Sequence, residues 1–216
     1  MKKIAVILAG CGVYDGAEIN EAVLTLLEIL SQGATYQCMA PNIDQAHVIN
    51  HLTGQEMSET RNVLVEAARI ARGNILDVAA ANPADYDALI MPGGFGVAKN
   101  ISTFAFKGTG CSINEDVLNF AQKIRDAHKP IGLICIAPAL APLIFGEGVI
   151  TTIGVDAGMA VEIENMGGVH QRCTLKDIVV DHANKYVSTP AYMLAENPLQ
   201  AQEGIRKLVT KVLELC

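Results

Sequence analysis

The sequence has no tryptophan, and aromatic residues make up only 5% of its 216 residues. Half of the residues are hydrophobic, so a buried core must be built mainly from Ile, Val, Leu and Ala. Such a core is typical of parallel strands that helices cover on both faces. The length suits one sizeable domain, and we expect residues 1–216 to form it.

Basic runs and long apolar runs are also missing. No five consecutive residues are basic and the formal net charge is −7, which argues against nucleic acid and against an anionic membrane surface as partners. No uninterrupted apolar stretch reaches the length of a transmembrane helix. Residues 1–10 begin with two lysines and an apolar stretch, but this stretch is too short for a signal peptide, and we expect a first strand there.

Recognisable cofactor and metal motifs are absent. None of the six cysteines forms a C-x-x-C pair or joins histidines at zinc-like spacing, and no G-x-G-x-x-G occurs. We therefore expect no metal and no cofactor. Scattered cysteines favour reduced thiols and a cytoplasmic location, which leaves room for one catalytic thiol.

Strands and helices alternate along the chain. The alternation predicts a doubly wound α/β domain with a mainly parallel sheet, helices on both faces and one small antiparallel hairpin. Residues 43–57 look like an insertion that covers part of the molecule. Apolar runs predict strands at residues 3–9, 35–40, 86–91, 131–134, 177–181 and 186–189, and helical spacing predicts helices at 19–30, 58–72, 114–128, 137–145 and 203–215.

Cys135 follows a predicted strand and precedes a predicted helix, at the sheet edge where such folds bind ligands. A helix N-terminus beneath the thiol would lower its pKa, and the N–H of Ile136 would face an oxyanion. The competing interpretation is that Cys135 is simply a small buried apolar residue. Its position in the sequence alone does not decide between the two.

Two other loops are expected at the same edge. Gly93 and Gly94 lie in a Gly-rich loop that could supply a second N–H to an oxyanion, although an ordinary turn would look the same. Glu18 and Glu21 begin the first predicted helix, where a carboxyl group could shuttle a proton. Acidic residues at a helix start also occur simply because they oppose the helix dipole.

Five stretches carry a resemblance to a known family. The chain resembles the ThiJ/PfpI branch of the class I glutamine amidotransferase-like superfamily, and within it the ElbB subfamily, which is described as glyoxalase-like and linked to isoprenoid biosynthesis. The stretches are KKIAVILAGCGVYDGAEINEAV (2–23), VINHLTGQEMSETRNVLVEAARIARG (48–73), ALIMPGGFGVAKN (88–100), KPIGLICIAPA (129–139) and STPAYMLAEN (188–197).

The resemblance implies a flavodoxin-like fold, a homodimer, a cysteine at the strand–helix turn and a glutamate from the first helix. Cys135 and Glu21 match these positions, with Glu18 as the reserve, and Gly93 and Gly94 match the oxyanion loop. Many relatives carry a histidine beside the nucleophile. Here Ile136 follows Cys135 and the next histidine is His170, which argues against amide hydrolysis.

These features predict a cofactor-free, glutathione-independent glyoxalase of low activity. Cys135 would add to glyoxal or methylglyoxal, Gly94 and Ile136 would hold the oxyanion, and Glu21 would move a proton to give glycolate or lactate. The alternative is a non-enzymatic protein, associated with isoprenoid biosynthesis, whose cysteine senses oxidants or electrophiles or which only binds a ligand. Removal of glycation adducts is a third activity that the residues do not separate from the first.

Overall fold

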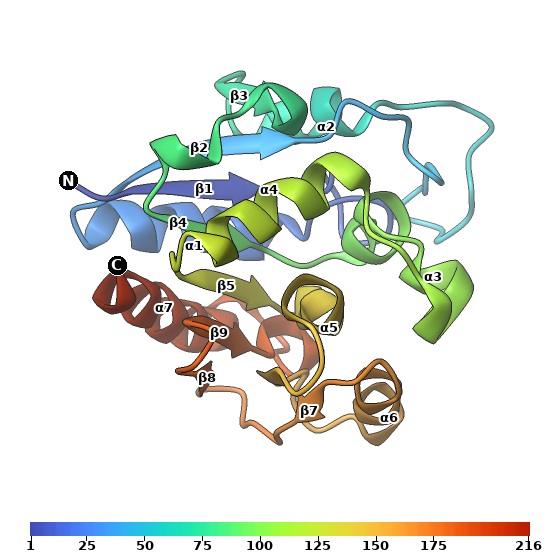
Figure 1. Cartoon of the computed structure of the whole chain (residues 1–216). Coiled ribbons are helices and arrows are strands. Elements are labelled where there is room, and N and C mark those ends of the chain that lie inside the picture. Colours follow the sequence, from blue (N-terminus) through green and yellow to red (C-terminus); the bar gives the residue numbers. More distant parts are fainter.

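The computed structural model describes residues 1–216 and centres on a seven-stranded sheet in the order β3-β2-β1-β4-β5-β9-β8 (Figure 1). All neighbouring strands are parallel except β8 and β9, which form the predicted antiparallel hairpin. The doubly wound architecture is thus confirmed. The strands are β1 (Lys3–Ile7), β2 (Thr35–Ala40), β3 (Ile75–Asp77), β4 (Ala88–Met91), β5 (Ile131–Ile134), β8 (Val179–Asp181) and β9 (Tyr186–Thr189).

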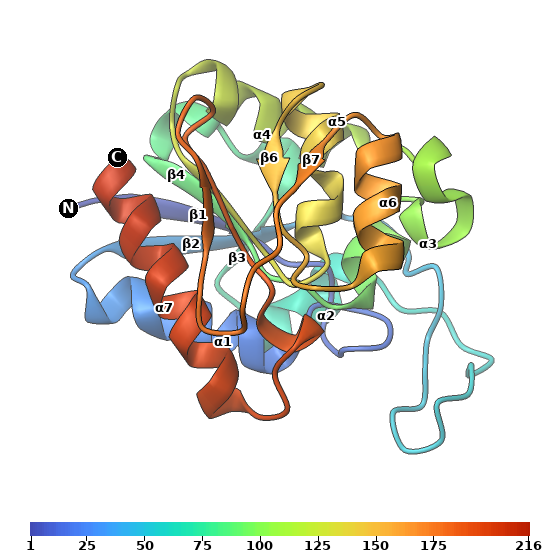
Figure 2. The same cartoon turned by 90° about the horizontal axis from the view of Figure 1, so that it is seen from below.

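Helices cover both faces of this sheet, as the view from below shows (Figure 2). On one face, α1, α2 and α7 enclose an aliphatic core with the side chains of that face, and on the other face α4, α5 and α6 enclose a second core. The helices are α1 (Ile19–Ser31), α2 (Val63–Ile70), α3 (Phe104–Lys107), α4 (Glu115–Asp126), α5 (Ala141–Phe145), α6 (Ala157–Asn165) and α7 (Pro198–Leu215). None of them combines the length and the apolar character needed to cross a bilayer.

Helix boundaries differ from the predictions where a capping residue sets them. The helix predicted from residue 58 begins at Val63, because the Asn62 side chain accepts the Val65 N–H and caps it. The helix predicted from residue 203 begins five residues earlier, at Pro198, with Asn197 as its cap. Both corrections follow from an asparagine whose side chain satisfies the first free N–H groups of the helix.

Residues 146–170 hold elements that the sequence did not predict. A separate two-stranded parallel sheet pairs β6 (Ile150–Thr151) with β7 (Val169–His170), and α6 lies between them in the chain. Strands this short carry no readable alternation. This unit helps to shape the cavity beside Cys135, because α6 contributes Met159 to its lining.

The order of the strands locates a crevice. From β1 the chain runs outward through β2 to β3 on one side, and the later strands are added from β4 on the other side, so connections diverge between β1 and β4. Ligands of doubly wound folds bind beyond the carboxyl ends of the strands at such a point. The loops after β1, β4 and β5 meet there.

Candidate active site

Cys135 lies directly after β5 in a backbone conformation that side chains rarely adopt. Its φ is +63°, and its N–H donates to the Thr189 carbonyl at 2.9 Å, which ties the turn to β9. Left-handed backbone at a non-glycine residue costs on the order of 1–3 kcal/mol and concentrates at functional sites. The turn lifts the side chain out of the sheet yet leaves Cys135 only 7% exposed.

Glu21 meets Cys135 from the first turn of α1. Its side chain is fully buried, hydrogen-bonded with the Cys135 side chain, and held at both oxygens by backbone donors. The Gly93 N–H donates to Oε2 at 2.9 Å and the Tyr192 N–H to Oε1 at 3.1 Å. Glu18, the reserve candidate, instead turns back to accept the Glu21 N–H at 2.6 Å as the cap of α1. The structure therefore brings Glu21 rather than Glu18 to the sulfur.

Burial sets the protonation of this pair. Loss of hydration raises the pKa of Glu21 to about 7, although the N–H groups of Tyr192 and Gly93 oppose the rise. Burial and then the negative charge of Glu21 raise the pKa of the Cys135 thiol well above its ordinary value. At pH values above about 7, an ionised Glu21 stands beside a protonated thiol, in the arrangement of a general base with its nucleophile.

The predicted lowering of the thiol pKa by a following helix is wrong. The segment after Cys135 is a 3₁₀ turn, Ala137–Leu140, followed by the five-residue α5. Such short segments carry little of the macrodipole of a long helix. The backbone N–H groups of Gly94 and Ile136 do face the sulfur and favour the thiolate, but burial outweighs them.

Two glycines of the loop after β4, Gly93 and Gly94, have different roles. Because the Gly93 N–H is taken by Glu21, Gly93 does not supply the oxyanion donor that the sequence suggested. Its task is to leave room, since a Cβ there would lie 2.4 Å from the Cys135 Cβ and 2.8 Å from Glu21 Oε2. Gly94 has a φ of +101°, and its N–H joins that of Ile136 at the sulfur.

A cavity of about 390 Å³ opens above the sulfur. Seven of its nine lining residues are hydrophobic, and they come from the loop after β1, the loop after β4, the turn at Cys135, α6 and the 3₁₀ turn Ala191–Met193. Glu18 is the one acidic side chain in the lining, and no basic side chain is present. A volume in this range suits a small organic ligand.

Asn100 fastens the loops that shape this cavity. Its Nδ2 donates to the carbonyls of Ala9 and Asp15 at 3.0 and 2.8 Å, and its Oδ1 accepts the Ala46 N–H at 2.9 Å. Asn100 lies in a π-helical turn, Val97–Ile101, a form that often occurs near functional sites. Sequence reasoning missed it because no local pattern marks a buried asparagine.

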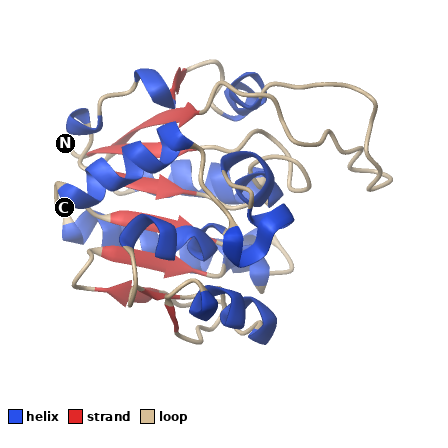
Figure 3. Ribbon diagram, turned by 45° about the vertical axis from the view of Figure 1, so that its right-hand side comes forward, coloured by secondary structure: helices blue, strands red, loops and turns tan.

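The insertion at residues 43–57 covers the loop after β1. It contributes no residue to the lining of the cavity above the Cys135 thiol. The Ile49 N–H donates to Asp15 Oδ2 at 2.7 Å, and the Tyr14 N–H donates to His51 Nε2 at 3.2 Å. From these contacts the segment extends away from the body of the molecule, as the tan loop in Figure 3 shows. It braces the loop that contributes Val13 to the cavity.

No histidine reaches the sulfur. None lines the cavity, and His170, which lies in β7, accepts the Ile153 N–H at its Nε2 atom. Burial lowers the pKa of His170. No cluster of three or more His, Cys, Asp or Glu side chains has the geometry to hold a metal ion. The arrangement offers a nucleophile, a carboxyl base and two N–H donors.

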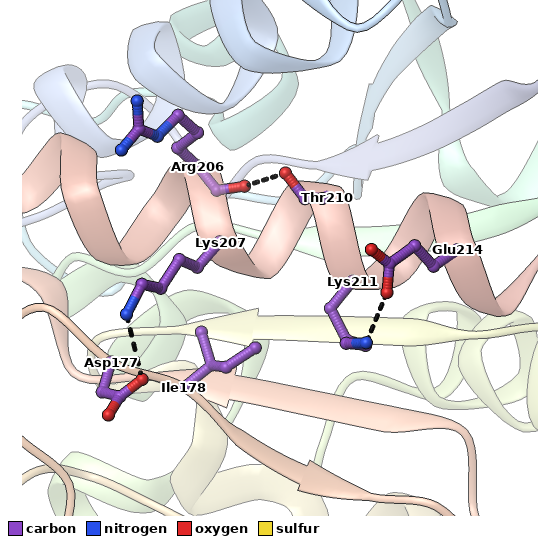
Figure 4. A pocket seen from close by; sticks show the side chains of 7 residues that line it. All are labelled: Asp177, Ile178, Arg206, Lys207, Thr210, Lys211 and Glu214. Carbon is purple, nitrogen blue, oxygen red and sulfur yellow. Dashed lines mark hydrogen bonds and ion pairs between the residues drawn. The ribbon is translucent and has the colours of Figure 1, made fainter.

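A second concavity lies between α7 and the start of β8 (Figure 4). Five of its seven lining residues are charged, and the Lys207 ammonium contacts the Asp177 carboxylate at 3.2 Å. Exposed ion pairs of this kind contribute little stability. It contains no cysteine and no histidine, so Cys135 remains the candidate nucleophile.

No protein-family model matches the chain, but individual proteins do. It is 45% identical over 223 residues to the human protein named glutamine amidotransferase-like class 1 domain-containing protein 3, mitochondrial, a match that covers 99% of this chain and 83% of that protein. The crystal structure of an Ehrlichia chaffeensis isoprenoid biosynthesis protein with an amidotransferase-like domain has a TM-score of 0.93 and 38% identity, over 100% of this chain and 99% of that one. A Candida albicans glyoxalase III, at 15% identity and a TM-score of 0.61 over 99% and 97% of the two chains, shares the fold.

The relatives overturn the expected cytoplasmic location. Curated proteins from human, Rattus norvegicus and Danio rerio, which are 45%, 43% and 35% identical to this chain, are all named mitochondrial. The prediction was wrong because scattered reduced cysteines only argue against an oxidising compartment and do not separate one reducing compartment from another.

The identity to these relatives extends over nearly the whole chain, and the flavodoxin-like fold agrees with it. This chain belongs to the glutamine amidotransferase-like class 1 domain proteins.

Proposed function

We propose that this protein is a cofactor-free glyoxalase that converts α-oxoaldehydes, such as glyoxal and methylglyoxal, into α-hydroxy acids. The observation that carries the proposal is the buried contact between Cys135 and Glu21 at the base of a cavity, with the N–H groups of Gly94 and Ile136 directed at the same sulfur. This set supplies what the reaction requires: a nucleophile, one group that moves protons, and donors for an oxyanion.

The first step forms a bond between Cys135 Sγ and the aldehyde carbon. Glu21 accepts the thiol proton as the bond forms, and the new oxyanion accepts hydrogen bonds from Gly94 and Ile136. Glu21 then returns the proton to that oxygen, which gives a neutral hemithioacetal and restores the carboxylate. The raised pKa of Glu21, about 7, suits a group that both takes and gives a proton at neutral pH.

The second step moves hydrogen between the two carbonyl carbons of the substrate. Glu21 removes the proton from the former aldehyde carbon, and an enediolate forms. The hydroxyl proton passes to the neighbouring oxygen, and Glu21 delivers its proton to the adjacent carbon, which leaves a thioester of the α-hydroxy acid. Water then cleaves the thioester to release the acid and the Cys135 thiol, so the sum is oxoaldehyde plus water to hydroxy acid.

Two competing functions find less support in the geometry. Amide hydrolysis by a cysteine nucleophile ordinarily uses a histidine as both base and acid, and no histidine lines the cavity. Sensing of oxidants favours an exposed thiol with a lowered pKa. Cys135 is 7% exposed and burial raises the pKa of its thiol.

Steady-state consumption of methylglyoxal without glutathione tests the proposal. We expect saturable production of lactate by the wild type, and losses of at least about a hundredfold in kcat for Cys135→Ala and Glu21→Gln. Cys216→Ala is the matched control, since that thiol lies at the end of α7 and outside the cavity. Stoichiometric loss of methylglyoxal without turnover would reject catalysis and favour a sensor or a binding protein.

A further inference from the structure

The cavity above Cys135 is much larger than the aldehydes named above. At about 390 Å³ it falls within the range that encloses drug-sized ligands, roughly 300–1,000 Å³, whereas methylglyoxal carries one methyl group beside its two carbonyls. The reacting carbonyls need only the space between the sulfur, Gly94 and Ile136. Most of the cavity is therefore left for the remainder of the substrate.

The wall of this remaining space is apolar and adaptable. Met159 from α6 and Met193 from the 3₁₀ turn before α7 face it, together with Val13 and Phe95 from the two loops. Methionine side chains fit irregular apolar shapes and contact aromatic rings favourably. Phe95 is 51% exposed, so its ring lies at the mouth of the cavity, where a large apolar substituent would cover it.

The charge of the lining excludes a different class of substrate. The acidic Glu18 lines the cavity and no Lys, Arg or His does. The nearby Lys99 ammonium donates to the Tyr14 carbonyl at 3.0 Å and lies over the Phe95 ring at 5.4 Å, outside the lining. A substrate with a carboxylate or phosphate group would bring its charge next to Glu18 with no cation to pair with.

We propose that the enzyme selects uncharged α-oxoaldehydes with a bulky apolar substituent, aromatic or branched, and rejects anionic ones. The proposal rests on the proposed function and adds the substrate class. Cys135, Glu21 and the two N–H donors act on the oxoaldehyde group that all candidates share. Met159, Met193 and Phe95 bind the substituent, and Glu18 disfavours negative charge.

Three aldehydes separate these properties: methylglyoxal, phenylglyoxal, and phenylglyoxal with a carboxylate on the ring. We expect kcat/KM for phenylglyoxal to exceed that for methylglyoxal by about tenfold to a hundredfold, since a filled apolar pocket discriminates on this scale. The ring carboxylate should lower kcat/KM by at least about tenfold. The rate of aldehyde loss with the Cys135→Ala protein is subtracted from each rate. This subtraction removes the contribution of phenylglyoxal that reacts with arginine side chains.

A charge placed in the wall should reverse the preference. Met159→Lys adds a cation to the cavity, and it should raise kcat/KM for the carboxylated substrate relative to phenylglyoxal by at least about tenfold. Val161→Lys is the matched control, because it adds the same charge to α6 at a position that is 52% exposed and outside the lining. An equal ratio in both variants would show that the cavity wall does not set charge selectivity, and would overturn the proposal.

Binding without turnover separates this proposal from the one it rests on. Acetophenone and benzoate both contain the phenyl ring of phenylglyoxal, but only benzoate carries a negative charge. Their binding is compared by the NMR shifts of the Met159 and Met193 methyl groups. Acetophenone should shift both signals and benzoate should not, even if no aldehyde is turned over. Turnover of methylglyoxal with no preference for phenylglyoxal and no shift by acetophenone would refute the substrate class and leave the glyoxalase reaction standing.

Discussion

Gly93→Ala tests whether the Cys135–Glu21 contact depends on a missing side chain. The added Cβ would lie 2.4 Å from Cys135 Cβ, 2.8 Å from Glu21 Oε2 and 3.0 Å from Cys135 Sγ. Since carbon atoms in contact are about 3.5 Å apart, Cys135 or the loop must move by about 1 Å. Gly93 has no left-handed φ, so the effect is one of space rather than of backbone strain.

The displacement predicts two separate losses. Forcing a methyl group into a packed site costs about 1–3 kcal/mol of the free energy of unfolding. A misplacement of about 1 Å between reacting groups costs about a hundredfold in rate, so kcat should fall by that factor. Gly110→Ala is the control, because a Cβ at Gly110 meets no heavy atom within 4 Å.

Urea unfolding and initial rates with methylglyoxal measure these losses in the same two variants. Gly110→Ala should match the wild type in both assays. If Gly93→Ala unfolds at lower urea but keeps kcat within about threefold of the wild type, the loop has moved without disturbing the pair. That result would refute the view that the absence of a side chain at Gly93 sets the catalytic geometry.

Four further predictions concern the ionisation of Glu21, the packing of Asn100 and the assembly of the chain. The pKa of Glu21 is about 7 in the folded protein against 4.5 for the free group, so its burial lowers the free energy of unfolding by about 3 kcal/mol in total as pH rises between these values. In urea titrations, the free energy of unfolding of the wild type relative to that of Glu21→Gln should fall by this amount from pH 4 to pH 8. A difference that does not change with pH would contradict the burial of Glu21. As the base, Glu21 must be ionised before attack, so kcat/KM should rise with pH through about 7, and a fall with pH would exclude it as base. Asn100→Ala leaves three backbone groups without partners and should cost about 2–4 kcal/mol in urea, whereas exposed Asn119→Ala should be nearly neutral. The homodimer that the resemblance implies should sediment at twice the chain mass of 22.9 kDa, and sedimentation at the single mass would reject it.

The sequence predicted the parts of the fold that local patterns encode. β2 and β5 match their predicted bounds, and the hairpin of β8 and β9 is present. The short strands β6 and β7 were missed because two residues cannot show a period. Strand β3 was missed for a similar reason, since its three residues lie in a stretch without a clear pattern.

The candidate site was predictable in its members but not in its electrostatics. Position in the chain and the family resemblance brought forward both Cys135 and Glu21. The burial that raises both pKa values is a property of the assembled core, which no local pattern reports. The same holds for the role of Gly93, which depends on a contact 72 residues away in the chain.

Some residues that help to build the candidate site show no pattern in the sequence that would identify them. The Tyr192 N–H, which donates to Glu21, follows Ala191, whose φ is +40°. An alanine in a sequence does not predict a left-handed conformation. The stretch that holds both residues matches the resembling subfamily, but the match gave them no role. The role of Asn100 can be recognised only from its hydrogen bonds in the folded structure, which join separate loops.

Rapid quenching during turnover shows whether Cys135 forms a covalent bond with the substrate. Wild-type protein mixed with methylglyoxal is quenched in acid at successive times, and the Cys135 peptide is weighed by mass spectrometry. We expect a methylglyoxal adduct on Cys135 that appears and decays at rates no slower than kcat. The adduct should be absent in Cys135→Ala and should form at least about a hundredfold more slowly in Glu21→Gln. Undiminished lactate production with an unmodified Cys135 throughout would contradict covalent catalysis by Cys135.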